Sequence, residues 1–263
     1  MLTPLALHQA LRLKKTAQRL PEADGPRHGE APGPEPGLRL LAIGESPLAG
    51  VGLGHQSQTL TALLAGLLAD QLDQSVSWQT AARGGVTAER CRHELIPQLE
   101  SGPADLIIIC LGVNDSTRLR SPGRWTRDLT DLIADLRQRH GQTPIILTGV
   151  PDMQQFPLLP EPLAVILGLR SRLLDQAATN LAANLEDVHH AALPLDAEST
   201  ALFCEDGFHP NSEGHEQWAE QLAGFAVEQG ILAKGRRGEG AKGRRGEGAK
   251  GRAVAVFSPL QPV

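Results

Sequence analysis

The sequence predicts a three-layer α/β/α domain whose sheet is mostly parallel and has five strands. Two observations support this fold class. Short apolar segments alternate with longer segments of helical periodicity, which is the pattern of a parallel sheet covered by helices on both faces. The segment Leu106–Leu111 is apolar at every position, as expected for a central strand that is buried on both sides.

The remaining strands are predicted from short apolar or β-branched runs bounded by polar and glycine-rich segments. In chain order, the five strand segments are 38–43, 76–81, 106–111, 145–148 and 186–191. Helices are predicted where apolar residues recur with helical periodicity, over 60–68 and 125–136, and a late helix through Trp218, Leu222 and Phe225 closes the domain.

Right-handed crossovers between parallel strands bring the carboxyl ends of all strands to one edge of the sheet, where such sheets bind ligands. Ser46, Asn114 and the loop that begins at Val150 each follow the end of a predicted strand. We therefore expect these three segments to lie at the same edge.

The composition divides the chain into three regions. Residues 1–37 form a helix and a linker arm, because 21–37 are rich in Pro, Gly and Glu. Residues 38–232 form the α/β domain. Residues 233–263 form a basic Gly/Arg/Lys tail, in which Ala-Lys-Gly-Arg-Arg-Gly-Glu-Gly occurs twice and a third copy starts at Ala249. Because the repeat has no apolar face, we predict that the tail is disordered.

The N-terminal helix is expected to pack on the domain. The alternative is an amphipathic helix that rests on a membrane surface, since Leu5, Leu11 and Leu13 stand beside Arg12, Lys14, Lys15 and Arg19. Its cations follow the apolar part, the reverse of a secretory signal, and no apolar stretch approaches the length of a membrane span.

The charge distribution limits the partners that we expect, and the number of cysteines indicates the cellular compartment. The chain carries a net charge of −5, and the tail has eight Lys/Arg and two Glu, so residues 1–232 carry −11. The tail is interpreted as a solubilising segment without a specific nucleic-acid partner, and contact with the acidic body or with anionic lipid is the alternative. Three scattered cysteines favour neither a disulfide framework nor a zinc site, which indicates a reducing, cytoplasmic location.

One candidate nucleophile stands at the end of the first core strand. Ser46 follows the apolar run 38–43 and Gly44, and it precedes Pro47. A residue before proline is disfavoured in helical geometry, so we expect Ser46 on a bend with its N–H free. Serine in such a turn is also a common cap residue.

Two later turns contain candidate donors to an oxyanion. Gly85 could offer a backbone N–H where a side chain would obstruct the substrate, and Asn114 could offer its side-chain amide. Both are also common turn residues, and the neighbouring Asp115 is expected to be structural.

The strongest candidate for a general base is His209. Asp206 precedes it by three residues, a spacing that lets one loop carry both groups. In that arrangement His accepts the serine proton, and Asp fixes the imidazole tautomer.

Taken together, these segments resemble the four motifs of the SGNH/GDSL hydrolase family, over roughly residues 38–230. The family's Gly-Asp-Ser is matched by Gly44-Glu45-Ser46, its second-motif glycine by Gly85, its Gly-x-Asn-Asp by residues 112–115 and its Asp-x-x-His by residues 206–209. The resemblance implies a flavodoxin-like SGNH-hydrolase fold, a triad of Ser46, Asp206 and His209, and an oxyanion hole of Ser46, Gly85 and Asn114. It implies no metal and no cofactor. Glu45 departs from the family's aspartate, and we expect activity to survive because the charge is kept.

The implied activity is esterase or lipase chemistry on a small-molecule ester. We expect short- to medium-chain acyl esters, with lysophospholipids or acyl thioesters as natural substrates, because the loop that begins at Val150 is apolar. A carbohydrate O-deacetylase and a non-catalytic member of the fold are the alternatives. A classical α/β-hydrolase lacks support, since Leu48 stands where that motif has glycine, and His55 interrupts a dinucleotide-binding pattern at Gly50–Gly54.

Overall fold

A computed structural model of the chain describes residues 3–193 and 197–232. Its sheet has six strands in the order β1-β3-β2-β4-β5-β6. The strands are β1 (His28–Ala31), β2 (Leu38–Gly44), β3 (Val76–Ala82), β4 (Leu106–Cys110), β5 (Ile145–Thr148) and β6 (Val188–Ala191). All neighbouring pairs are parallel except β1 with β3.

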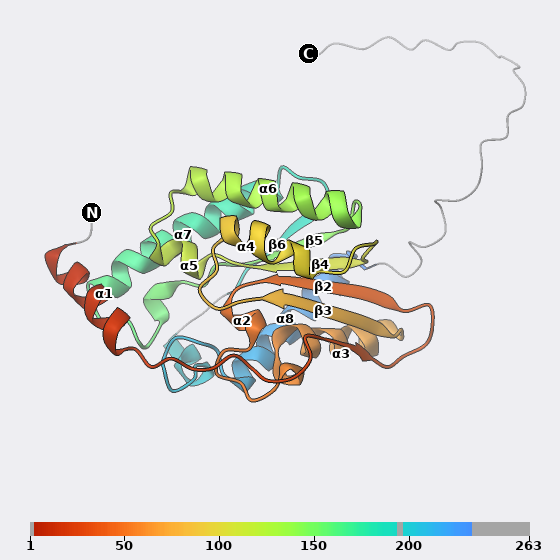
Figure 1. The fold of residues 1–263 in the computed structure, drawn as a ribbon, viewed down its shortest axis with the longest axis horizontal. Helices are drawn as coiled ribbons and strands as arrows, with labels where there is room; N and C mark the ends of the chain where they lie inside the picture. The colour runs from red at the N-terminus through yellow and green to blue at the C-terminus, as the bar shows by residue number, and fades with distance from the viewer. Residues whose placement is uncertain (1–2, 194–196, 233–263) are drawn as a thin grey trace, which may run out of the picture. The chain divides into compact units, whose positions relative to one another are not determined.

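Helices connect these strands and cover both faces of the sheet. They are α1 (Pro4–Thr16), α2 (Ser46–Ala49), α3 (Leu60–Leu72), α4 (Ala88–Glu94), α5 (Val113–Thr117), α6 (Pro122–His140), α7 (Leu163–Ala182) and α8 (Ser212–Glu228), with short 3₁₀ turns at 56–58, 96–98, 153–155 and 197–202. In Figure 1, α4, α6 and α7 lie on one side of the sheet, and α3 and α8 lie on the other. The predicted three-layer α/β/α class is therefore confirmed.

Two apolar cores hold the layers together, and the alternation of side chains along each strand explains why there are two. Leu40 and Ala42 of β2 face α3 and α8, whereas Leu41 and Ile43 face α4, α6 and α7. All five residues of β4 are buried, as the uniformly apolar run predicts. The five predicted strands agree with β2 to β6 to within two residues at each end.

The predicted number of strands was wrong by one, because the arm before residue 38 contributes β1. Its residues His28-Gly29-Glu30-Ala31 have low β-propensity and half-exposed side chains. They join the sheet through backbone pairing with the free edge of β3, from His28 opposite Gln79 to Ala31 opposite Val76. A linker was predicted here because proline and glycine flank the segment. The hydropathy of residues 28–31 gives no sign of an edge strand.

The N-terminal segment forms α1, which is capped by the Thr3 side chain and packs on the domain through Ala6. Among residues 3–193 and 197–232, no candidate for a membrane-spanning helix is found. The predicted disordered tail at 233–263 lies outside the described residues.

Candidate active site

The candidate nucleophile Ser46 lies at the first position of α2, at the carboxyl end of β2. The bend falls at Glu45, whose backbone is extended, so it occurs one residue earlier than predicted. Gly44 is required just before it, because a Cβ there would lie 2.0 Å from the carbonyl oxygen of Cys110. Within the described part of the chain, the Ser46 N–H donates no hydrogen bond.

Gly85 lies in the loop between β3 and α4 with φ = 78°, a left-handed conformation that favours glycine. A Cβ there would meet no atom within 4 Å, so the space beside the loop is open. No acceptor takes the Gly85 N–H among the residues described. The geometry thus requires glycine for its backbone conformation and leaves its donor unpaired.

Asn114 lies in α5, directly after β4, and its amide is held by Glu45. The Glu45 carboxylate accepts hydrogen bonds from Val113 N at 2.9 Å and Asn114 N at 3.0 Å, and also from Asn114 Nδ2. One hydrogen of the Asn114 amide remains for another acceptor. Burial raises the pKa of Glu45 to about 8, although the hydrogen bonds from Asn114 and Val113 oppose that shift.

This contact was not predicted, because Glu45 was expected only to be a tolerated variant of the family's aspartate. Glu45 directly precedes Ser46, is 2% exposed, and reaches from the end of β2 to the loop after β4. A single buried carboxylate thus ties the candidate nucleophile to a candidate oxyanion donor. The only sequence signal for a buried role of Glu45 was its position directly after the glycine that ends the strand.

Asp206 and His209 form the pair that their spacing predicts. His209 Nδ1 lies 2.6 Å from Asp206 Oδ2, while Asp206 Oδ1 accepts from the N–H groups of Phe208 at 2.9 Å and His209 at 3.0 Å. Burial alone would raise the pKa of Asp206, but the hydrogen bonds from His209 and Phe208 outweigh it and lower that pKa. Because an ionised carboxylate only accepts, Nδ1 carries the proton and Nε2 is free to accept one.

A second His–Asp pair was not predicted. His190 Nε2 of β6 lies 2.8 Å from Asp175 Oδ1 of α7, and the same oxygen accepts from Val150 N at 2.8 Å. This pair fixes the start of the loop after β5. It does not line the cavity that contains Ser46 and His209.

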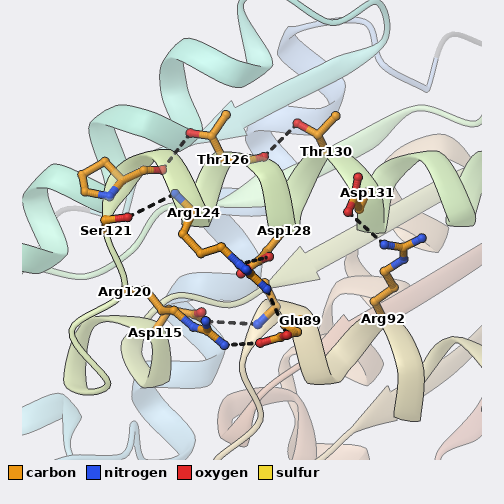
Figure 2. A network of polar contacts seen from close by, with 12 residues as sticks. Glu89, Arg92, Asp115, Arg120, Ser121, Arg124, Thr126, Asp128, Thr130 and Asp131 are labelled. Atoms are coloured by element: carbon orange, nitrogen blue, oxygen red, sulfur yellow. Dashed lines mark hydrogen bonds and ion pairs between the residues drawn. The ribbon is translucent and has the colours of Figure 1, made fainter.

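Asp115 connects the two loops that contain Asn114 and Gly85. It is fully buried and accepts from Ala88 N at 3.1 Å, and burial raises its pKa to about 6. Figure 2 shows the ion pairs around it: Arg120 and Arg124 both reach Glu89 of α4, and Arg124 Nε lies 2.8 Å from Asp128. The Asp115 side chain thus holds the start of α4 against α5, and the neighbouring ion pairs join α4 to α6 and to the turn after α5.

Ser46 and His209 line one cavity of about 260 Å³ at the carboxyl edge of the sheet. In the described residues no hydrogen bond joins their side chains, and such bonds often tighten only when substrate binds. The other lining groups are mostly apolar, and they include Leu111, Pro151, Phe156, Phe203, Phe208 and Trp218. The Phe208 ring packs edge-to-face on the His209 ring, with 5.2 Å between the two ring centroids.

A larger groove of about 570 Å³ lies next to the same histidine. It is lined by Asn114, Asp206 and His209 on the catalytic side and by leucines of α1, α7 and the loops after β4 and β5. Leu11, Leu13 and Lys14 of α1 line part of it. Sequence reasoning did not predict that α1 forms a wall beside the candidate site, because no motif marks this packing.

Comparisons with known proteins bear on the family and on the fold. Residues 42–217 match the sequence profile of the GDSL-like lipase/acylhydrolase family. A GDSL-like esterase of Mycobacterium tuberculosis is 26% identical over 192 residues, which cover 70% of this chain and 60% of that protein. The chain therefore spans less than two thirds of that relative's length.

Several solved structures have the same fold at low identity. The psychrotrophic esterase EstA of Pseudoalteromonas sp. aligns with a TM-score of 0.56 and 19% identity, covering 73% of this chain and 97% of that one. TesA aligns with a TM-score of 0.56 and 23% identity, over 74% and 99% of the two chains. A carbohydrate esterase family 2 enzyme of Myceliophthora fergusii aligns with a TM-score of 0.54 and 19% identity, over 76% and 68%.

Proposed function

The chain belongs to the GDSL-like lipase/acylhydrolase family. From this premise we propose that it is a serine hydrolase that cleaves acyl esters, with Ser46 as nucleophile, His209 as general base and Asp206 as the group that orients the imidazole. The observation that supports this assignment most is the hydrogen-bonded Asp206–His209 pair, whose ring lines the same cavity as Ser46. No metal or cofactor enters the proposed steps.

In the first step, Ser46 Oγ attacks the ester carbonyl carbon while its proton passes to His209 Nε2. The carbonyl oxygen becomes an oxyanion, and Asp206 stabilises the imidazolium without accepting its proton. Three donors are assigned to the oxyanion: the N–H groups of Ser46 and Gly85 and the Asn114 amide. The two backbone groups have no competing acceptor among the described residues, which supports this assignment.

In the second step, the tetrahedral intermediate collapses and the bond from carbon to the alcohol oxygen breaks. His209 gives its proton to the leaving alkoxide, so that the alcohol departs and an acyl ester of Ser46 remains. Water then attacks this acyl-enzyme, with His209 again accepting a proton. The same oxyanion donors serve both steps. When the second tetrahedral intermediate collapses, the bond from the acyl carbon to Ser46 Oγ breaks, His209 returns its proton to Oγ, and the acid is released.

The volume and the lining of the cavity indicate which acyl groups it can hold. Its volume of about 260 Å³ lies just below the usual range of ligand sites, roughly 300–1,000 Å³, and its walls are mainly leucine, phenylalanine, proline and tryptophan. This lining favours a short- to medium-chain acyl group, with lysophospholipids or acyl thioesters as candidate natural substrates. A sugar acetate, the substrate of the alternative deacetylase function, would leave most of the apolar lining unused.

The test is covalent labelling by a fluorophosphonate probe, followed by identification of the labelled peptide. Ser46→Ala should abolish labelling and hydrolysis of p-nitrophenyl acyl esters, and His209→Ala should abolish nearly all hydrolysis. Ser57→Ala is the matched control, because Ser57 Oγ also lies near a histidine, 3.0 Å from His55 Nδ1, but at an exposed site outside the cavity. Wild-type turnover in Ser46→Ala would refute the assignment, and a non-catalytic protein would remain unlabelled in every variant.

A further inference from the structure

Exposed leucines are concentrated on the elements that border the groove. Within 3–193 and 197–232, seven large hydrophobic side chains are exposed, and six of them belong to α1, α7 and the turn after α5. We call these six the leucine patch: Leu5, Leu7, Leu11, Leu119, Leu169 and Leu173. Single exposed leucines are ordinary, but a cluster on neighbouring elements marks an interaction surface.

Direct contacts hold the three elements of the patch together. The Gln9 side chain of α1 donates to the Glu161 carbonyl at 2.7 Å and accepts from Leu163 N at 3.2 Å, which attaches α1 to the start of α7. Arg170 of α7 donates to the Arg120 carbonyl at 2.6 Å, which places the turn that contains Leu119 against α7. Figure 1 shows α1 next to α7 and α5 at one end of the sheet.

Helix α1 packs inward through Ala6, Ala10 and Leu13, and its other leucines are exposed. Ala6 is completely buried against the cluster that includes Met153 and Phe156. Leu7 and Leu11, one turn apart, remain exposed. A packed helix that leaves leucines exposed has a face that the rest of the domain does not cover.

The charge around α1 contrasts with the rest of the chain. Residues 3–21 contain Arg12, Lys14, Lys15 and Arg19 and no acid, whereas the whole chain carries −5. None of these four cations forms an ion pair within the described part of the molecule. Leucines interspersed with unpaired cations complement an apolar layer under anionic headgroups.

The patch is continuous with the groove that reaches His209. Leu11 and Leu119 belong to both: they are exposed, and they line the groove together with Lys14, Asn114 and His209. A surface that covered the patch would therefore lie at the entrance of this groove. An amphiphilic ester held in such a surface could therefore enter the groove directly.

We propose that the leucine patch and the cations of α1 dock the protein on the surface of an anionic phospholipid membrane, with the groove mouth at the lipid–water boundary. The benefit of docking to catalysis rests on the proposed esterase function, but docking itself does not require turnover. Leu7 and Leu11 would enter the headgroup region, and Arg12 and Lys15 would contact lipid phosphates.

The experiment is co-sedimentation of the full chain with vesicles of phosphatidylcholine containing about one third phosphatidylglycerol, compared with pure phosphatidylcholine. We expect binding to the anionic vesicles that weakens as salt increases. Leu5→Gln/Leu7→Gln removes two patch leucines that do not line the groove and should raise the lipid concentration at half-binding by roughly tenfold or more. Val227→Gln is the matched control, since Val227 is 38% exposed on α8, outside the patch.

A second pair of variants tests the cations. Arg12→Gln/Lys15→Gln should weaken binding by about 30-fold, from about fivefold per cation. Arg127→Gln, which removes an exposed cation of α6, should leave binding within about twofold of wild type. No binding to anionic vesicles at low salt would overturn the proposal. So would equal binding by wild type and both double variants, since it would assign binding to another segment such as 233–263.

Hydrolysis of a soluble p-nitrophenyl ester separates this proposal from the esterase assignment. Leu5→Gln/Leu7→Gln should retain wild-type rates on that ester and lose only vesicle binding. Ser46→Ala should lose the rate and keep vesicle binding. Vesicle binding without any Ser46-dependent hydrolysis would refute the proposed function alone, whereas hydrolysis without vesicle binding would refute docking alone.

Discussion

Replacement of Glu45 by Gln tests whether this buried acid controls Asn114. Gln has nearly the same shape, but its Nε2 can only donate. One or two of the three hydrogen bonds from Val113 N, Asn114 N and Asn114 Nδ2 would then lose their acceptor. The Asn114 amide would no longer be held in place, although Ser46 and His209 would be unchanged.

The effect on stability follows from the pKa of Glu45, which burial raises from 4.5 to about 8. A raised carboxyl pKa means that the folded state binds more protons than the unfolded state between these values, so stability falls as pH rises through that window. Each pH unit corresponds to about 1.4 kcal/mol. Wild type should therefore lose about 3 kcal/mol relative to Glu45→Gln between roughly pH 5.5 and pH 7.5.

The assay is urea unfolding of both proteins at several pH values, and the slope of the stability difference against pH is the observable. Lost hydrogen bonds shift the two curves by a constant, so they do not affect the slope. Parallel curves for wild type and Glu45→Gln would refute the reasoning, because they would mean that Glu45 does not titrate in this window in the folded protein.

Kinetics of the same variant test its action through Asn114. We expect Glu45→Gln to lower kcat by about tenfold or more with a smaller change in KM, because an oxyanion donor acts mainly in the transition state. Glu45→Asp, which keeps a carboxyl group, should retain more activity. If Glu45 acts through the amide, adding Glu45→Gln to Asn114→Ala should cause little further loss, and fully additive losses would contradict that coupling.

Three further predictions concern single side chains. Asn114→Ala should reduce kcat by roughly a hundred- to a thousand-fold with little change in KM; steady-state kinetics would check this, and a change confined to KM would contradict it. His215 accepts from Leu60 N at 3.1 Å, and burial lowers its pKa from 6.5 to about 4, so the unfolded state binds more protons between these values and stability falls on acidification. Compared with His215→Asn, wild type should lose about 2 kcal/mol more from pH 6.5 to about pH 5 in urea unfolding, and equal losses would exclude this assignment. Trp125→Phe removes the donor to the Leu174 carbonyl at 3.0 Å and should cost about 2 kcal/mol with KM unchanged; thermal unfolding and kinetics would test it, and an unchanged Tm would oppose it.

Much of the fold could be predicted from the sequence because the central strands have both faces buried. Continuous apolar runs such as 106–111 have few alternatives in a chain of alternating strands and helices. The edge at which Ser46, Asn114 and Val150 meet follows from the handedness of parallel crossovers, so the order of the motifs was enough to predict it. The Asp206–His209 contact was predictable because one loop carries both residues.

The features that were missed depend on contacts between distant segments. β1 forms because the edge of β3 offers unpaired backbone groups, and the four residues 28–31 have no pattern of their own. Glu45 reaches Asn114 across 69 positions of sequence, and α1 reaches the groove by packing on α7. Periodicity reports which side of an element is buried, but it does not identify the partner that covers it.

The two buried acids give a physical reason why the candidate oxyanion donors hold one arrangement. Glu45 ties the end of β2 to the loop after β4, and Asp115 ties that loop to the start of α4, just beyond Gly85. The three donors thus come from the ends of three adjacent strands that two carboxylates connect. Burial raises the pKa of both acids, to about 8 and about 6. The two contacts that hold the donors in place therefore lower the stability of the fold more as the pH rises. Catalytic preorganisation of this kind is commonly destabilising, and a protein that gains stability from Glu45→Gln while losing kcat would be an example of that trade-off.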